Sequence, residues 1–163
     1  MSTRDVRSNE EFDIPQELYE KLAADPFAIL LGITIDSIKP GYARASMSIT
    51  HDMLNAATTA HGGAMMALID VVHAAVSNSH GTLAVAQHVH TEFLNAGSVG
   101  DVLTCEGVEL SLTKRTAVFR IDVWAESREG RAERQLVSTA LARVFRIGKP
   151  WLPDQIGEGT TKS

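Results

Sequence analysis

The chain has little cysteine and no excess of positive charge, and both facts limit the functions that we expect of it. Cys105 is the one cysteine among 163 residues, so no disulfide can form within the chain and a reducing compartment is expected. Lys and Arg number 15 against 20 Asp and Glu, which gives a formal net charge of -5. Nucleic-acid-binding domains carry the opposite balance, so we expect no nucleic-acid partner.

The sequence also has no apolar run long enough to cross a membrane. Its apolar segment at residues 62–76 contains an acidic residue and is shorter than the roughly 20 residues that a membrane-spanning helix needs. Residues 1–13 are polar and charged, without the apolar core of a secretion signal. We therefore expect a cytoplasmic protein with no membrane partner, and we interpret Cys105 as a small core residue.

What remains is the composition of one ordinary globular domain. Hydrophobic residues make up 44% of the chain and charged residues 21%, and the length suits a single domain. We expect a mobile N-terminal segment over residues 1–13, a folded domain over residues 14–148 and a C-terminal tail over residues 149–163.

Hydrophobic patterning predicts the elements of this domain. Two short helices are expected first, and alternating apolar positions then predict strands near residues 33–39, 42–50, 82–94, 102–112, 117–125 and 134–147. Between the second and third strands, residues 62–76 are long enough for about four helical turns. Long antiparallel strands must cover their apolar face. The expected fold is therefore α+β, an antiparallel sheet wrapped around one long central helix.

One acidic residue lies inside this otherwise apolar helix. Apart from Asp70 and His73, every residue of 62–76 is apolar or glycine. A helix that is apolar on all sides is expected to be buried, and an uncompensated carboxylate there costs several kcal/mol. The alternative is that Asp70 points out of the fold, as many single acids in helices do.

Asn55 and His61 precede the helix, and Gly62 and Gly63 begin it. Free backbone N–H groups at a helix N-terminus attract an anion or a developing oxyanion. A carboxylate two turns further on, such as Asp70, can act as a nucleophile or a base. This combination indicates chemistry on a carbonyl group.

The order of elements and this motif resemble the hotdog fold, and specifically the acyl-CoA thioesterases of the phenylacetate-degradation (PaaI-like) type. The resemblance covers roughly residues 27–148. It implies that Asp70 is the catalytic carboxylate, as nucleophile or as base for water, and that the Gly62 N–H polarises the thioester carbonyl. It also implies that His61 and Asn55 shape the site near the thioester and its water.

The same resemblance implies a site shared between two subunits, in a homodimer or a dimer of dimers. Asp70 of one subunit would then face the motif residues of the other. Gly63 and Met66 are expected to contact the substrate, and Arg115, on a hairpin, to bind the phosphates of CoA. The expected reaction is hydrolysis of a medium-chain or aromatic acyl-CoA to the free acid and CoA, with no cofactor and no metal.

Two positions depart from the family pattern. The family often has a Ser or Thr that helps to hold water in the strand after the helix, whereas here no hydroxyl precedes Thr91 within residues 84–91. The family also often has a Pro-Ala turn after this strand, on the pantetheine side, where this chain has Asn95-Ala96-Gly97.

Other functions stay open. A hotdog enoyl-CoA hydratase would require an Asp-x-Asn-x-x-His order, which residues 51–57 do not have. A non-catalytic acyl-CoA-binding module is disfavoured by an isolated buried Asp70. His73, His88 and His90 form a possible metal-ligand set, with neutral histidines beside a site as the alternative interpretation.

Overall fold

The computed structural model describes residues 13–152, so most of the expected N-terminal segment and the end of the tail lie outside the described residues. The helices are α1 (Gln16–Ala23), α2 (Pro26–Leu30), the short 3₁₀ helix η1 (His51–Met53) and α3 (Gly62–Asn78). The strands are β1 (Thr34–Lys39), β2 (Tyr42–Ser48), β3 (Thr82–Phe93), β4 (Val102–Leu112), β5 (Thr116–Ala125) and β6 (Gln135–Pro150).

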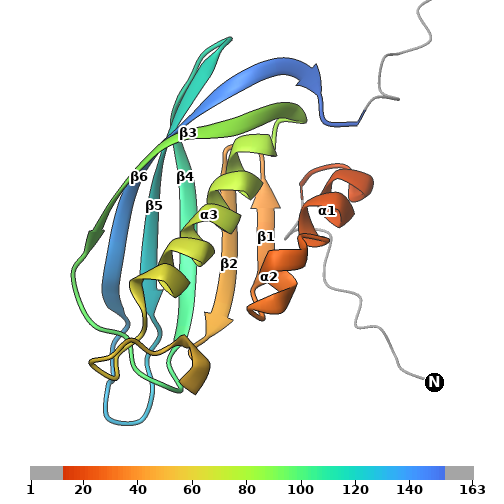
Figure 1. The fold of residues 1–163 in the computed structure, drawn as a ribbon. Helices are drawn as coiled ribbons and strands as arrows, with labels where there is room; N and C mark the ends of the chain where they lie inside the picture. The colour runs from red at the N-terminus through yellow and green to blue at the C-terminus, as the bar shows by residue number, and fades with distance from the viewer. Residues whose placement is uncertain (1–12, 153–163) are drawn as a thin grey trace, which may run out of the picture.

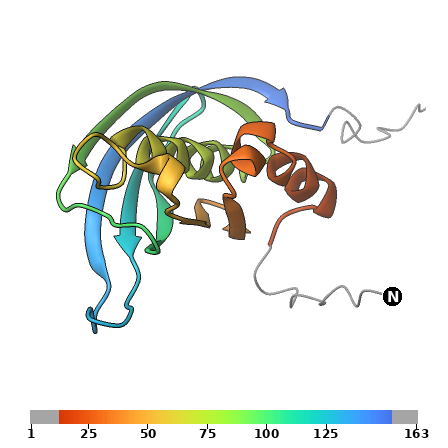
Figure 2. The ribbon, with the colours of Figure 1, turned by 60° about the horizontal axis from the view of Figure 1, so that its bottom comes forward.

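The strands form one antiparallel sheet that curls around α3. Their order is β1-β2-β4-β5-β6-β3, so β3 pairs only with β6 and forms an edge (Figure 1). Seen from below, α3 lies in the hollow of the sheet, and α1 and α2 lie beside it (Figure 2). This is the predicted hotdog architecture.

The predicted strand faces form the core. On β2, Ala43, Ala45 and Met47 are buried, and on β5 the alternate residues from Ala117 to Ala125 are buried in the same way. Cys105 on β4 is fully buried as predicted, and burial raises the pKa of its thiol well above the usual value. An undissociated, inaccessible thiol is a core group rather than a nucleophile.

A glycine on β4 determines how closely the helix approaches the sheet. A Cβ at Gly107 would lie 2.8 Å from Cγ1 of Val72 on α3. Any larger residue would push the two elements apart, because close-packed interiors do not absorb an extra carbon at that distance.

The folded domain continues past residue 148. β6 ends at Pro150, the Trp151 N–H donates to the carbonyl of Gly81 at 2.8 Å, and Leu152 is buried. The Lys21 ammonium of α1 lies 5.9 Å from the centre of the Trp151 ring. The start of the expected tail is therefore part of the fold.

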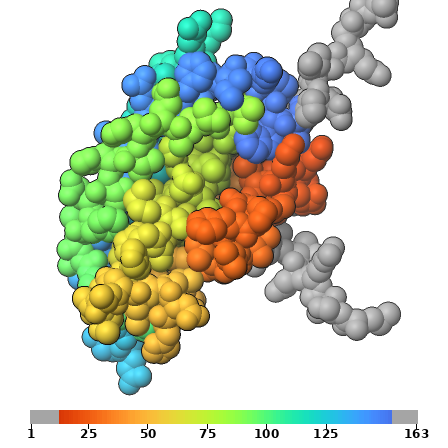
Figure 3. Space-filling view, in the orientation of Figure 1, coloured from red at the N-terminus to blue at the C-terminus, as the bar shows by residue number. Residues whose placement is uncertain are grey.

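The central helix is not buried on all sides, and the expectation of a buried Asp70 is wrong for the single chain. Gly63, Asp70 and Ala74 are exposed and Met66 is half-buried, a spacing that places all four on one face of α3. Figure 3 shows this face of the helix between β3 and α2. The sheet covers the rest of α3, but no element within residues 13–152 covers this stripe. None of the helices in that range is long and apolar enough to cross a membrane.

Candidate active site

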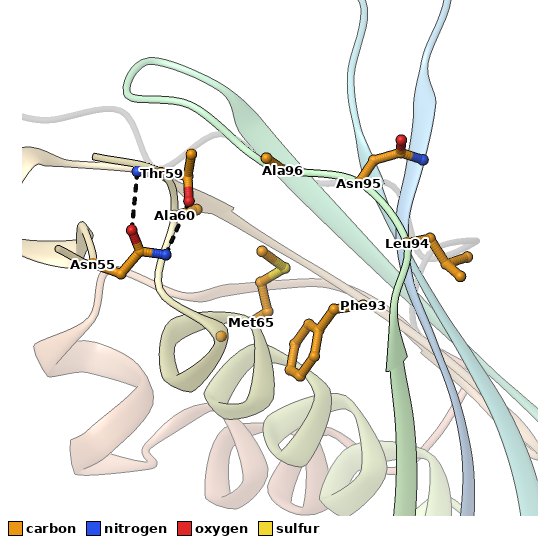
Figure 4. Close-up of a pocket in the computed structure, with 9 residues that line it drawn as sticks. Asn55, Thr59, Ala60, Met65, Phe93, Leu94, Asn95 and Ala96 are labelled. Carbon is orange, nitrogen blue, oxygen red and sulfur yellow. Dashed lines mark hydrogen bonds between the residues drawn. The ribbon is translucent and has the colours of Figure 1, made fainter. Parts of the chain in front are cut away.

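The loop before α3 is held by the side chain of Asn55. Its Oδ1 accepts the N–H groups of Ala57 (2.9 Å) and Thr59 (3.2 Å), and its Nδ2 donates to Thr59 Oγ1 at 2.9 Å (Figure 4). Thr58 adopts a φ of 60°, a strained backbone for a β-branched residue. Asn55 therefore shapes the loop that carries the chain into the helix.

His61 is the N-cap of α3 and accepts hydrogen bonds from most of the backbone N–H groups in the first turn of the helix. Its Nδ1 accepts the Gly63 N–H at 2.8 Å, and its carbonyl accepts the N–H groups of Ala64 (2.9 Å) and Met65 (3.3 Å). An Nδ1 that accepts leaves the ring proton of a neutral histidine on Nε2.

Gly62 has the one N–H among the first four of α3 that has no acceptor within residues 13–152. It stands at the positive end of a 17-residue helix, where a partial negative charge is stabilised. This is the geometry that a donor to a carbonyl oxygen requires.

A pocket of about 370 Å³ opens beside Gly62. Asn55, Thr59, Met65, Phe93 and Asn95 are among the residues that line it (Figure 4). A Cβ at Gly62 would lie 3.2 Å from Cζ of Phe93, a tight contact, so the ring at the end of β3 would have to shift for any larger residue. The φ of Gly62 is not positive, so this contact, and not backbone strain, is what the structure shows against a larger residue.

A second hollow of about 240 Å³ lies on the other side of the same turn. His61, Gly63 and Ala64 form its α3 wall, and Phe27 and Leu31 from the α2 region form the opposite one. Asp52, Met53 and Leu54 complete the lining. Gly63 lines this hollow, and its contact with substrate stays a prediction.

Asp70 is far from Gly62 within one chain. They are eight positions apart, which is about 12 Å along a helix axis. Asp70 has no hydrogen bond or ion pair to any residue of 13–152, and its side chain lies on the exposed stripe of α3. One chain therefore does not bring its own carboxylate to its own Gly62.

His73, one turn after Asp70, is buried against Phe119, with the ring centres 5.7 Å apart. Burial lowers the pKa of His73, and the nearby Asp70 carboxylate opposes this only in part. Its Nε2 is buried with no hydrogen-bond partner among the described residues. His73 is therefore held neutral in the core.

Two expected substrate contacts lie outside both hollows. Met66 is on the exposed stripe, where its sulfur accepts the Thr91 hydroxyl at 3.2 Å, and Met65 lines the pocket instead. Arg115 lies in the β4–β5 hairpin, at the opposite end of the sheet from the loop of Asn55 (Figure 1). β5 alone has ten residues, about 33 Å of strand, so Arg115 cannot reach a ligand at Gly62 of its own chain.

The histidine cluster does not form. His73 is buried in the core, whereas His88 and His90 are exposed on β3. Across residues 13–152, no group of three or more His, Cys, Asp or Glu side chains is placed to hold a metal ion.

Sequence reasoning missed Phe93 and Asp101. Phe93 looked like any apolar strand residue, and only the fold brings it over Gly62.

Asp101 is buried in the loop after β3 and pairs with Arg128 (2.5 Å) and Arg131 (3.1 Å) of the β5–β6 hairpin. Burial alone would raise the pKa of Asp101, but the Ser98 N–H and the two arginines hold it below the usual value. This cluster fastens the hairpin to the loop that carries Asn95.

The fold and the helix N-terminus together define a class, a hotdog domain in which the Gly62 N–H has no acceptor within residues 13–152 and lies beside a pocket. The sequence profile of the thioesterase superfamily matches residues 57–132. The acyl-coenzyme A thioesterase PaaI of Escherichia coli is 37% identical over 99 residues, which cover 61% of this chain and 71% of the relative.

Solved structures agree. The structure of the E. coli PaaI protein matches with a TM-score of 0.74 and 31% identity, covering 83% of this chain and 94% of that one. A thioesterase of Streptococcus pneumoniae solved with coenzyme A matches with a TM-score of 0.68 and 27% identity, covering 76% and 94%. The chain belongs to the thioesterase superfamily, and within it to the PaaI-like acyl-CoA thioesterases, so it is a thioester hydrolase.

Proposed function

We propose that this protein hydrolyses acyl-CoA thioesters with a medium-chain or aromatic acyl group, releasing the free acid and CoA in the cytoplasm. The observation that carries the proposal is the Gly62 N–H, which has no acceptor within residues 13–152 and lies at the start of α3 beside two hollows. The E. coli relative is named for acyl-CoA hydrolysis, and the S. pneumoniae structure contains coenzyme A, which supports CoA as the carrier.

In the proposed reaction, the thioester oxygen accepts the Gly62 N–H. The negative charge that develops on this oxygen is stabilised by that N–H and by the helix dipole, and one such donor is worth about 3 kcal/mol. Asp70 attacks the carbonyl carbon or takes a proton from a water that does so. The C–S bond breaks and CoA leaves as the thiolate. If Asp70 attacks, the mixed anhydride on its carboxylate is then hydrolysed by water, which regenerates Asp70 and releases the acid; if Asp70 activates water, the acid forms directly. In both routes the proton from the water protonates the thiolate.

The carboxylate comes from a second copy of the chain in this proposal. The separation of about 12 Å between Gly62 and Asp70 along α3 prevents one chain from supplying both groups. A two-fold related copy lying against the exposed stripe of α3 would run its helix in the opposite direction. Asp70 of the partner subunit would then lie near Gly62, and Arg115 of the partner subunit on the same side as the CoA phosphates.

The edge of β3 supports a homodimer, with a dimer of dimers as a further possibility. Twelve residues of β3 have one unpaired side, and Val85 and Phe93 are 44% and 52% exposed. Long exposed sheet edges pair readily with another strand. Association of two copies along β3 would cover this edge and the stripe of α3 together.

A screen of acyl-CoA esters tests the reaction directly. Esters that differ in chain length and aromaticity are mixed with the protein and a reagent that reports free thiol. Thiol release with hexanoyl-, octanoyl- or phenylacetyl-CoA is expected.

The alternative of a non-catalytic binding module was disfavoured because Asp70 was expected to be buried. Asp70 is exposed in the single chain, so that argument against a binding module no longer holds. Binding without thiol release from any ester would overturn the proposal and favour that module, and hydration of an enoyl-CoA would favour the hydratase.

A further inference from the structure

We propose that the hollow between α2 and the start of α3 is the acyl site, and that Phe27 sets the preference for acyl length. The hollow lined by Gly62 then receives the pantetheine arm. This inference rests on the proposed function, because it divides the two arms of one thioester between two hollows.

The two hollows share one turn of the chain. His61 and Gly63 line the α2–α3 hollow, while Gly62, between them, lines the other. A carbonyl held by the Gly62 N–H therefore lies at the boundary, with one substituent able to enter each side.

The linings differ in chemistry. Asn55, Thr59 and Asn95 bring polar side chains to the hollow beside Gly62, and the Oδ1 of Asn95 has no donor within residues 13–152. The α2–α3 hollow is walled by Phe27, Leu31, Met53, Leu54 and Ala64. Pantetheine contains two amides, which lose free energy when buried without partners, whereas a hydrocarbon chain gains it.

Charge at the α2–α3 hollow favours a neutral acyl group. Asp52 lines it, and no Lys or Arg among residues 13–152 does. A second carboxylate on the acyl chain would meet a like charge there. The expected acyl groups are therefore uncharged alkyl or aryl groups.

Phe27 is held in place as a rim residue. Asp25 Oδ1 accepts the N–H groups of Phe27 (2.8 Å) and Ala28 (3.2 Å), and Ala28 is buried in the core. The Phe27 side chain is nevertheless 56% exposed. The backbone of Phe27 is therefore held in place while its ring is partly exposed beside the hollow, so the ring can cover a bound acyl chain without any change in the fold.

The test compares Phe27→Ala with Ile29→Ala across CoA esters from acetyl to octanoyl. Ile29 belongs to the same helix and is 64% exposed, but it does not line the hollow. In the wild type, kcat/KM should rise about fourfold for each methylene buried. Phe27→Ala should flatten this rise, with the smallest change for acetyl-CoA, whereas Ile29→Ala should leave the whole series unchanged.

Leu94→Ala tests the other hollow, since Leu94 lines it. It should change the KM for every ester by the same factor, whatever the acyl length. If Leu94→Ala flattens the series and Phe27→Ala does not, the acyl group binds on the Gly62 side and the assignment is wrong.

Binding of S-alkyl-CoA thioethers, which cannot be hydrolysed, separates this assignment from the proposed function. Calorimetry should give a Kd that tightens with alkyl length in the wild type and less so in Phe27→Ala. If that dependence is present but no ester is hydrolysed, the acyl site stands and the proposed reaction fails. If the dependence is the same in both proteins, the acyl site is refuted whatever the turnover.

Discussion

At the scale of single residues, α3 carries two different functional groups: a backbone N–H at its first residue, Gly62, and a carboxylate two turns later, at Asp70. Gly62 supplies a donor because the other N–H groups of the first turn are already paired with His61. Asp70 supplies a carboxylate without a partner among residues 13–152, on an exposed face. A charge left free on an apolar helix is more easily explained by a reaction than by stability.

Asp70→Asn tests the role of this charge. The amide keeps the shape but cannot act as a nucleophile or a base, so kcat should fall at least about 100-fold. Binding of CoA esters should persist. The melting temperature should hold or rise, because an amide costs less to cover than a carboxylate. A destabilised but fully active variant would mean that Asp70 is structural.

His61 has a capping role that can be separated from any role in the site. His61→Ala removes the acceptor for the Gly63 N–H and should lower the free energy of unfolding by about 1 kcal/mol. His61→Asn keeps an acceptor at the N-cap but lacks a ring N–H. Chemical denaturation should show stability restored in the asparagine variant. If kcat stays low there, His61 also acts on the substrate, whereas recovery of both would leave capping as its whole role.

At the scale of elements, α3 shows what the sequence could and could not predict. Its apolar run predicted the helix, and its glycines and His61 predicted where it starts. The apolar run did not predict that one face of the helix stays exposed, because the sequence pattern shows which residues are apolar and not which other elements pack against them. Asp70, Met66 and Ala74 mark that stripe only once the sheet is in place.

α3 should also make the domain sensitive to acid, through His73. Burial lowers the pKa of His73 in the folded chain below the ordinary 6.5, so the unfolded chain binds more protons below that pH. Stability from this group is complete above about pH 6.5 and decreases as the pH falls towards the folded-state pKa, by at most about 1.4 kcal/mol per pH unit.

His73→Phe should remove this slope while keeping the ring packed on Phe119. Thermal unfolding between pH 7 and pH 5 is the measurement, with His51→Gln as an exposed control. The wild type and the control should lose stability together on acidification, and His73→Phe should lose less. Three parallel curves would show that His73 is not the group that titrates.

At the scale of the whole molecule, alternation predicted all six strands and the faces of β2 and β5, because each strand has one side towards the core. It did not predict that β6 runs to Pro150 or that β3 is left as an edge, since pairing partners are far away in the sequence. Phe93 meets Gly62, and Asp101 meets Arg128, only through the sheet order. The motif predicted a set of site residues, and the fold shows that one chain keeps two of them, Gly62 and Asp70, apart.

The proposed shared site requires two chains, because its Gly62 and its Asp70 come from different copies. Two inactive variants are needed, Asp70→Asn and Gly62→Val, the second because a side chain at Gly62 would meet the Phe93 ring and block the carbonyl. Both are expected to be inactive as homodimers. Circular dichroism of each variant checks that the fold is retained.

The most direct measurement is the thioesterase activity of a mixed dimer of these two variants, purified through a different tag on each chain. If the site is shared, Gly62 of the first chain meets Asp70 of the second, one of the two sites is intact, and activity returns to about half that of the wild type. If each chain holds its own site, neither site is intact, and the mixed dimer stays as inactive as its parents.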